Sequence, residues 1–239
     1  MSAGKLILIS WHIGDARDMS DRSIEALRAL GVLLVEDIEY SREGLRRLGV
    51  NPNAKTVLAV PERPNAEFLA RVLATLARGD VGMLSSGGTP GFVDPGAWLV
   101  AEVRRRGGRV EALPGPSCLA TMLAMSGIEW RDKRTSSFTF AFFLDGPPGG
   151  GEEENFTALA RRPEPLLVFL LPGRVERCLA LLEPVVGRRP VTIFFDLSKP
   201  RNEYPMADEA RTMTCAQWRE VLPSLPWKKI SDLALMVGP

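Results

Sequence analysis

The sequence predicts an α/β protein with a largely parallel β-sheet. Short apolar runs, which suit strands buried on both faces, alternate with segments whose apolar residues repeat at helical spacing. Such alternation is typical of β-α units that build a parallel sheet covered by helices. Two connections from strand to helix, at 84–96 and 113–117, are rich in glycine and proline. Such connections let a ligand approach the backbone closely, because few side chains stand in the way.

The first half of the chain contains most of the clean β-α units. Asn65 is placed to cap a helix that Gly79 closes, and Asp94 with Pro95 suits the start of another helix. We expect strands at 5–10, 32–35, 56–60, 81–84 and 109–113. We expect helices from Met19 to Gly31, at 41–48, from Asn65 to Gly79 and at 95–106.

The composition changes after Ser117, and clean β-α repeats become fewer. We expect helices at 117–125, 174–186 and 217–222, and strands at 138–144, 166–171, 191–197 and 233–237. The segment 145–154 (DGPPGGGEEE) is a surface loop by composition. We therefore place a domain boundary near Pro114 and expect two α/β domains, at 1–114 and 115–239.

Composition narrows the class of protein. The 239 residues include 30 basic and 29 acidic side chains, which argues against a chain built mainly to coat nucleic acid and leaves a local basic patch open. Cys118, Cys178 and Cys215 are far apart, so neither a metal site nor a disulfide framework is indicated, and a reduced cytoplasm is the simplest location. The apolar run near the N-terminus is too short for a signal peptide or a membrane span.

Several common nucleotide and hydrolase motifs are missing. The first strand is followed by Ser10-Trp11-His12-Ile13-Gly14, without the G-x-G-x-x-G of a dinucleotide fold. The sequence also lacks the lysine-containing P-loop and a G-x-S-x-G motif. From composition alone, the 84–96 loop is as consistent with a tight structural turn as with ligand binding.

The loops nevertheless carry a specific resemblance. Thr89-Pro90 followed by Asp94-Pro95-Gly96, then Leu113-Pro114-Gly115-Pro116-Ser117, resembles the paired signature of the tetrapyrrole-methylase superfamily of S-adenosylmethionine-dependent methyltransferases. Within it, the chain is most similar to the family that 2′-O-methylates a cytidine of small-subunit ribosomal RNA. The resemblance covers about residues 4–130 and includes Ile13-Gly14-Asp15 and Val35-Glu36-Asp37.

The resemblance implies two tetrapyrrole-methylase-like α/β domains with the ligand cleft between them, S-adenosylmethionine as methyl donor, and a homodimer. An acceptor hydroxyl group would need a base, and the candidates are His12, because imidazole titrates near neutrality, and Asp37. A lone histidine such as His12 is equally consistent with a hydrogen-bonding or packing role. The residues expected to bind the cofactor are Ser85, Ser86, Gly87, Gly88, Thr89, Pro90, Ser117, Cys118 and Leu170. Asp94 is better interpreted as a helix cap, and the arginines at 42, 46, 47, 104–106 and 109 as solvated surface.

The chain also departs from the family pattern. Ser86 stands where the family has aspartate, and the strand end at 169–174 (FLLPGR) lacks its glutamate and histidine. A basic segment of the family falls on the acidic stretch 149–154. These departures leave three hypotheses open: a methyltransferase that O-methylates an RNA ribose, a methyltransferase of a small molecule such as a tetrapyrrole, and a catalytically inactive donor-binding protein.

Overall fold

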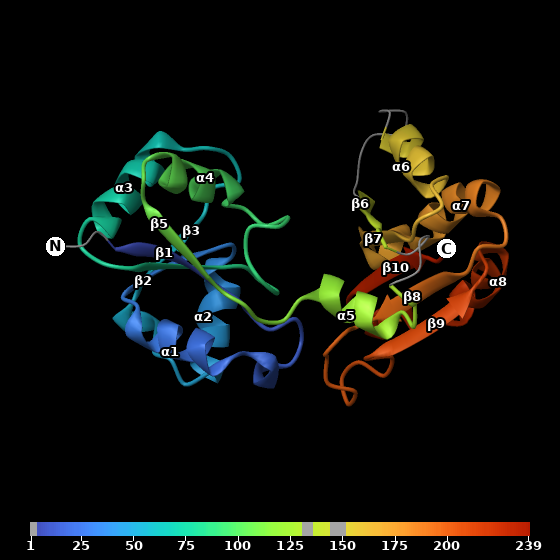
Figure 1. Ribbon diagram of the computed structural model, residues 1–239. Coiled ribbons are helices and arrows are strands. Elements are labelled where there is room, and N and C mark those ends of the chain that lie inside the picture. The colour runs from blue at the N-terminus through green and yellow to red at the C-terminus, as the bar shows by residue number, and fades with distance from the viewer. Residues whose placement is uncertain (1–3, 131–135, 144–151) are drawn as a thin grey trace. The chain divides into compact units, whose positions relative to one another are not determined.

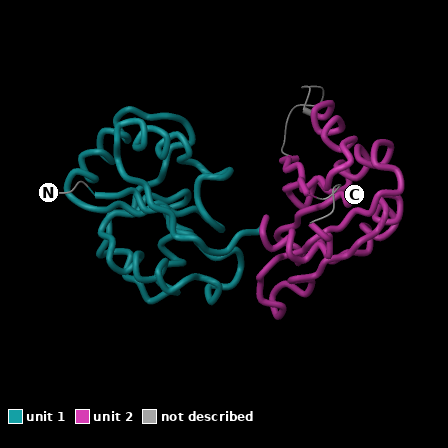
Figure 2. Tube along the Cα trace, viewed as in Figure 1, with its two compact units in different colours: residues 1–118 teal, residues 119–239 magenta. Residues whose placement is uncertain are grey.

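The computed structural model describes residues 4–130, 136–143 and 152–239. The chain divides into two compact units, residues 1–118 and 119–239 (Figure 2). Each unit contains one five-stranded sheet. The predicted α/β fold class is confirmed.

The sheet of the first unit is parallel throughout. Its strands are β1 (Lys5–Ile9), β2 (Val32–Val35), β3 (Thr56–Ala59), β4 (Val81–Leu84) and β5 (Arg109–Leu113), in the order β3-β2-β4-β1-β5. The central strand is therefore β4, and β1 lies between β4 and β5. The predicted strands are confirmed to within one residue at each end.

Helices cover both faces of this sheet (Figure 1). The helices are α1 (Asp21–Ala29), α2 (Ile38–Arg47), α3 (Ala66–Leu76) and α4 (Ala97–Arg105), with short 3₁₀ turns at Ala16–Asp18 and Pro52–Ala54. Leu27 of α1 and Leu45 of α2 pack in one cluster with Ile9 and Leu33, whereas α3 and α4 pack on Leu6 and the opposite face. Both faces are thus apolar, which explains why these strands read as continuous hydrophobic runs.

The second unit has a mixed sheet. Its elements are α5 (Cys118–Met125), β6 (Thr139–Phe143), α6 (Glu152–Ala160), β7 (Leu166–Leu170), α7 (Val175–Val186), β8 (Val191–Phe195), β9 (Glu209–Met213), α8 (Cys215–Val221) and β10 (Leu233–Val237). The strand order is β6-β7-β10-β8-β9; β6 and β7 are parallel, and the other pairs are antiparallel. Three further 3₁₀ turns lie at Pro172–Arg174, Leu222–Ser224 and Trp227–Lys229.

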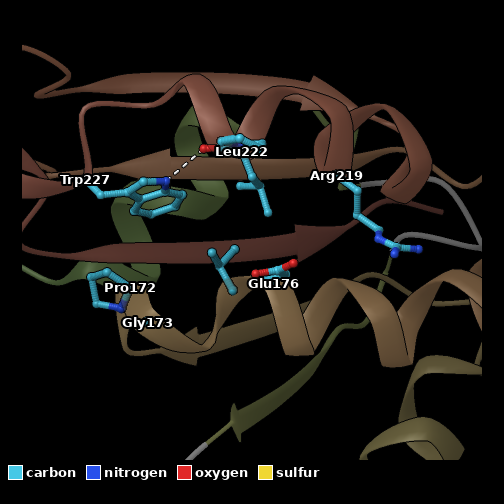
Figure 3. A pocket seen from close by; sticks show the side chains of 8 residues that line it. Pro172, Gly173, Glu176, Arg219, Leu222 and Trp227 are labelled. Carbon is cyan, nitrogen blue, oxygen red and sulfur yellow. Dashed lines mark hydrogen bonds between the residues drawn. The ribbon is translucent and has the colours of Figure 1, made fainter.

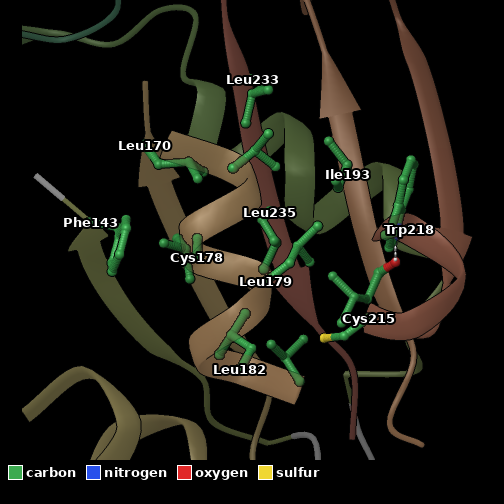
Figure 4. Close-up of a cluster of buried hydrophobic side chains, with 14 of the residues drawn as sticks. Phe143, Leu170, Cys178, Leu179, Leu182, Ile193, Cys215, Trp218, Leu233 and Leu235 are labelled. Carbon is green, nitrogen blue, oxygen red and sulfur yellow. Dashed lines mark hydrogen bonds between the residues drawn. The ribbon is translucent and has the colours of Figure 1, made fainter. Parts of the chain in front are cut away.

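One large cluster holds this second unit together (Figure 4). Leu179 and Leu182 of α7 pack with Leu235 of the central strand β10 and with Trp218 of α8. The indole of Trp218 is fully buried and donates to the carbonyl oxygen of Val191 at 2.8 Å, so its polar atom is satisfied. Apolar side chains of α7 and α8 and of the sheet thus share one core.

Two helices begin earlier than the sequence predicts. Helix α2 starts at Ile38 rather than at residue 41, because the Asp37 carboxylate accepts from the amide of Tyr40 and caps the helix. Helix α8 starts at Cys215 rather than at residue 217, because Thr214 and Gln217 form a reciprocal capping box. In both cases the capping residue was present in the sequence but its role was overlooked.

The predicted start of α4 is wrong. Asp94 does not cap the helix; α4 begins at Ala97, and Gly96, with a φ of 113°, stands at its N-cap without a side-chain hydrogen bond. The Asp94 carboxylate instead accepts from the amide of Gly91 at 3.0 Å. Gly91 also has a positive φ, 96°, so the loop folds back on its own aspartate before the helix starts.

Two elements of the second unit were not predicted. Strand β9 pairs only with β8 and alternates Glu209 and Arg211 with exposed positions, so it lacks an apolar signal. Helix α6 begins at Glu152 inside the predicted surface loop; residues 145–151 of that loop lie outside the described residues.

The core of the second unit generates a stability prediction. Leu235→Ala, in the central strand, should lower the free energy of unfolding by about 2–5 kcal/mol, because it removes buried methyl groups and leaves a cavity. Leu171→Ala is the matched control, since Leu171 is 57% exposed, and its change should stay within about 0.5 kcal/mol. Urea unfolding followed by circular dichroism measures both, and equal midpoints for the two variants would contradict this packing.

Candidate functional site

The connections that follow β1 and β4 leave the sheet toward opposite faces. The two strands are parallel neighbours, but the chain leaves β1 toward α1 on one face and leaves β4 toward α4 on the other. The loops that follow the two strands therefore diverge at the carboxyl edge of the sheet. In open α/β sheets, ligands bind outside this edge at the point where the connections diverge. The candidate site is thus the edge formed by residues 10–15, 85–96 and 113–117.

A serine hydroxyl ties three loops together at this edge. The hydroxyl group of Ser10, directly after β1, is 2.7 Å from the Thr89 hydroxyl oxygen and donates to the Leu113 carbonyl oxygen at 2.7 Å. Ser10 is fully buried. The next residue, Trp11, donates its amide proton to the Gly88 carbonyl oxygen at 2.8 Å. We call these contacts the Ser10 brace; they fix the loop after β1 against the loops after β4 and β5.

Two glycines make the close approach of these loops possible. A Cβ atom on Gly115 would lie 2.5 Å from the Ser10 Cβ, which is closer than real atoms come. A Cβ on Gly88 would lie 3.3 Å from the Pro116 carbonyl oxygen, and Gly88 has a φ of 74°. Glycine is therefore required at Gly115 by space and favoured at Gly88 by its positive φ, where the contact with Pro116 is also tight.

A carboxylate from a fourth strand holds the same loop. Glu36, which follows β2, accepts from the amide of Ser86 at 2.9 Å. Burial raises the pKa of the Asp94 carboxyl, and the nearby Glu36 carboxylate raises it further. Two carboxylates thus face one part of the loop, and a cationic ligand group there would relieve their repulsion.

His12 lies beside the brace and is half-buried. Its ring lies 5.3 Å from the indole of Trp11, centre to centre. Its Nδ1 atom is buried and has no hydrogen-bond partner in the described part of the chain. Burial lowers the pKa of His12, while the charges of Asp15 and Asp18 oppose this effect. The lowered pKa favours the neutral form of the ring, which can accept a proton.

Asp37 has a structural task that the sequence analysis did not assign. Its carboxylate accepts from the amide of Tyr40 at 2.8 Å, as the N-cap of α2. A carboxylate that is already engaged in capping is less suited to remove a proton from a substrate. Of the two predicted bases, His12 is therefore better placed by these contacts.

The other predicted site residues fall into two groups. Those of the first unit lie on the same edge: Ser85 is buried and donates to the Gly87 carbonyl oxygen at 3.1 Å, whereas Gly87 is exposed. Pro90, Ser117 and Cys118 lie in or next to the same loops, with Cys118 as the first residue of α5. Leu170 belongs to the second unit, at the end of β7, and its side chain packs in that unit's core.

The sequence analysis missed Ser10 and the role of Glu36. The signal was present: a small polar residue at the end of an apolar strand must satisfy its hydroxyl group when buried. Its partners, however, are 79 and 103 residues away along the chain, so only the strand order brings them together.

Comparisons with known proteins place the chain in a family. A family model described as Tetrapyrrole (Corrin/Porphyrin) Methylases matches residues 5–210. The chain is 30% identical over 202 residues to the ribosomal RNA small subunit methyltransferase I of Thermotoga maritima, which covers 84% of this chain and 86% of that protein.

Solved structures share the fold. A cobalamin biosynthetic enzyme, cobalt precorrin-4 methyltransferase, superposes with a TM-score of 0.69 at 17% identity, over 98% of this chain and 94% of that one. Uroporphyrin-III C-methyl transferase from Thermus thermophilus, complexed with S-adenyl homocysteine, gives 0.61 at 21% identity, over 98% and 92%.

The packing of Gly115 against Ser10 generates a prediction. Gly115→Ala should lower the free energy of unfolding by about 1–3 kcal/mol, because the added methyl group overlaps the buried serine. Gly31→Ala is the matched control, since no atom lies within 4 Å of a Cβ at that position. Thermal unfolding measures both variants; a Gly115→Ala protein as stable as the control would show that the loops do not meet in this way.

Proposed function

Because the chain belongs to the tetrapyrrole methylase family and is an S-adenosylmethionine-dependent methyltransferase, we propose that it methylates a ribose hydroxyl group of small-subunit ribosomal RNA. The observation that carries the choice of acceptor is the match of 84% of the chain to a ribosomal RNA small subunit methyltransferase I. The two solved methyltransferases described above are 21% and 17% identical to this chain and support the fold alone.

The residues at the candidate site fit the methyl donor. S-adenosylmethionine combines a cationic sulfonium with polar groups that need backbone and side-chain partners. The glycine-lined loop 85–90 offers backbone groups, Gly88 leaves room beside Pro116, and the Glu36 and Asp94 carboxylates supply negative charge. We propose that Ser85, Ser86, Gly87, Gly88, Thr89, Pro90, Ser117, Cys118 and Leu170 hold the donor.

The bound donor supplies a methyl group that is already activated by its positive sulfur, so the protein's main tasks are alignment and exclusion of water. The Ser10 brace fixes the loops that align the methyl group. His12 accepts the proton of the attacking hydroxyl group, because its neutral ring lies on the same edge. Asp37 caps α2. Helix α2 packs closely on the Trp11 indole, because a Cβ atom on Gly44 of this helix would lie 2.4 Å from the ring.

The setting of the reaction follows from the same proposal. The protein works in the cytoplasm, where ribosomal subunits are made, and as a homodimer, as the family resemblance implies. Among the described residues, no helix is long and apolar enough to span a bilayer.

The assignment of His12 predicts a pH profile. Because burial lowers the pKa of His12, kcat/KM should rise with pH through a pKa below 6.5 and stay level above it. His12→Gln should lower kcat by about 10²–10⁴-fold and remove this acid limb, with the affinity for S-adenosylhomocysteine unchanged. If the pH profile of kcat/KM is the same in His12→Gln as in the wild type, another group is the base, and Asp37→Asn is the next variant to test.

The acceptor is tested by methyl transfer from labelled S-adenosylmethionine. Small ribosomal subunits should become labelled, and after digestion of their RNA to nucleosides the label should be found as a 2′-O-methyl group. Uroporphyrinogen should not become labelled. Label on the tetrapyrrole alone would favour a small-molecule enzyme. Tight donor binding without transfer to either acceptor would favour the catalytically inactive donor-binding protein.

A further inference from the structure

The second unit contains a hollow whose lining residues are distant in sequence from the loops of the candidate site. It has a volume of about 440 Å³ and lies between the start of α7 and the segment after α8 (Figure 3). This volume is typical of small-molecule pockets. We call it the Trp227 pocket; its lining residues used below are Pro172, Glu176, Arg219, Pro223 and Trp227.

The indole of Trp227 forms a fixed apolar wall. The ring is half-buried and packs against the core of the second unit, and its Nε1 atom donates to the Leu222 carbonyl oxygen at 2.8 Å (Figure 3). Because this bond sets the orientation of the ring, the exposed part of the ring is presented as a rigid surface. Pro172 and Pro223 add rigid walls that carry no amide proton.

Both acidic and basic side chains lie at or beside the pocket. Glu176 lies in the first turn of α7, and its charge interacts with that of Arg219. Its carboxylate forms no hydrogen bond among the described residues. Arg219 is held by Glu183 at 2.8 Å. Lys228 and Lys229 directly follow Trp227, are exposed, and form no ion pair within the described part of the chain.

We propose that the Trp227 pocket binds an unpaired nucleobase of the RNA acceptor, one that carries an exocyclic amino group. This inference rests on the proposed function and adds a second contact to it. The base stacks on the indole of Trp227, as bases stack on aromatic side chains in single-strand binding sites. The Glu176 carboxylate accepts from the exocyclic amino group, as acidic side chains do with cytosine. Lys228 and Lys229 contact the flanking phosphates.

A proline-rich peptide is the main competing ligand, because grooves lined by aromatic residues also bind such segments. Two observations favour the nucleobase. The Glu176 carboxylate, which has no hydrogen-bond donor among the described residues, can accept from an exocyclic amino group, and a proline ring lacks such a donor. The unpaired lysines beside Trp227 suit an anionic backbone, which a proline-rich peptide also lacks.

The test uses the full chain and two readouts. One is the KM for small ribosomal subunits in methyl transfer; the other is the Kd of a fluorescent six-nucleotide oligocytidine, measured by anisotropy. Trp227→Ala should raise both about tenfold, the loss expected for one stacked base, whereas Trp227→Phe should raise them less than threefold. Glu176→Ala should remove the preference for oligocytidine over oligouridine.

A matched control separates stacking from general damage. Trp98 is also half-buried and donates its indole proton to a carbonyl oxygen, that of Pro61 at 2.9 Å, but it lies in the first unit. Trp98→Ala should leave the KM for subunits and the Kd of oligocytidine unchanged. The Kd for S-adenosylhomocysteine should be the same in the wild type and in all variants of the pocket.

The outcomes separate this inference from the proposed function. If the protein methylates small subunits but Trp227→Ala changes neither the KM for subunits nor the Kd of oligocytidine, the pocket is overturned and the proposed function stands. Trp227-dependent binding of oligocytidine without methyl transfer to subunits would support the pocket and overturn the acceptor. Binding of a decaproline peptide in place of oligocytidine would overturn the pocket as a nucleobase site.

Discussion

The structure of the candidate site depends on one buried hydroxyl group. Ser10 contacts Thr89 and the carbonyl oxygen of Leu113, so three loops that are far apart in the chain meet at one atom. In a buried setting the hydroxyl group must keep these partners, because an unsatisfied polar group costs about 1–3 kcal/mol. The same contact restricts Gly115 to glycine. The hydrogen bonds of one buried serine thus fix the loops whose backbone is proposed to hold the methyl donor.

The sheet topology decides where this arrangement can lie. Strands β1 and β4 are neighbours whose connections leave to opposite faces, and the diverging loops open the carboxyl edge there. The apolar runs at 5–9 and 81–84 and the glycine-rich loop after the second run made this part predictable from the sequence. Helix α3 was equally predictable, because Asn65 caps it as expected.

Other features could not be derived from the sequence. The Asp94-Pro95 pair reads as a helix start, yet two glycines with positive φ turn the loop back so that Asp94 bonds Gly91 instead. Strand β9 has no apolar signal, because it is an edge strand paired on one side only. The partners of Ser10 and Glu36 are set by strand order, which local patterns do not encode. The Trp227 pocket likewise forms between two segments, near Pro172 and near Trp227, that are far apart in the sequence.

The account is tested most directly by calorimetric titration of S-adenosylhomocysteine into the wild type and Ser10→Ala. The wild type should bind one equivalent per chain, and Ser10→Ala should bind at least about tenfold more weakly, because the loss of two hydrogen bonds releases the loops. Ser41→Ala, which alters a buried serine of α2, should bind like the wild type. Equal affinities for the wild type and Ser10→Ala would contradict the claim that the Ser10 brace builds the donor site.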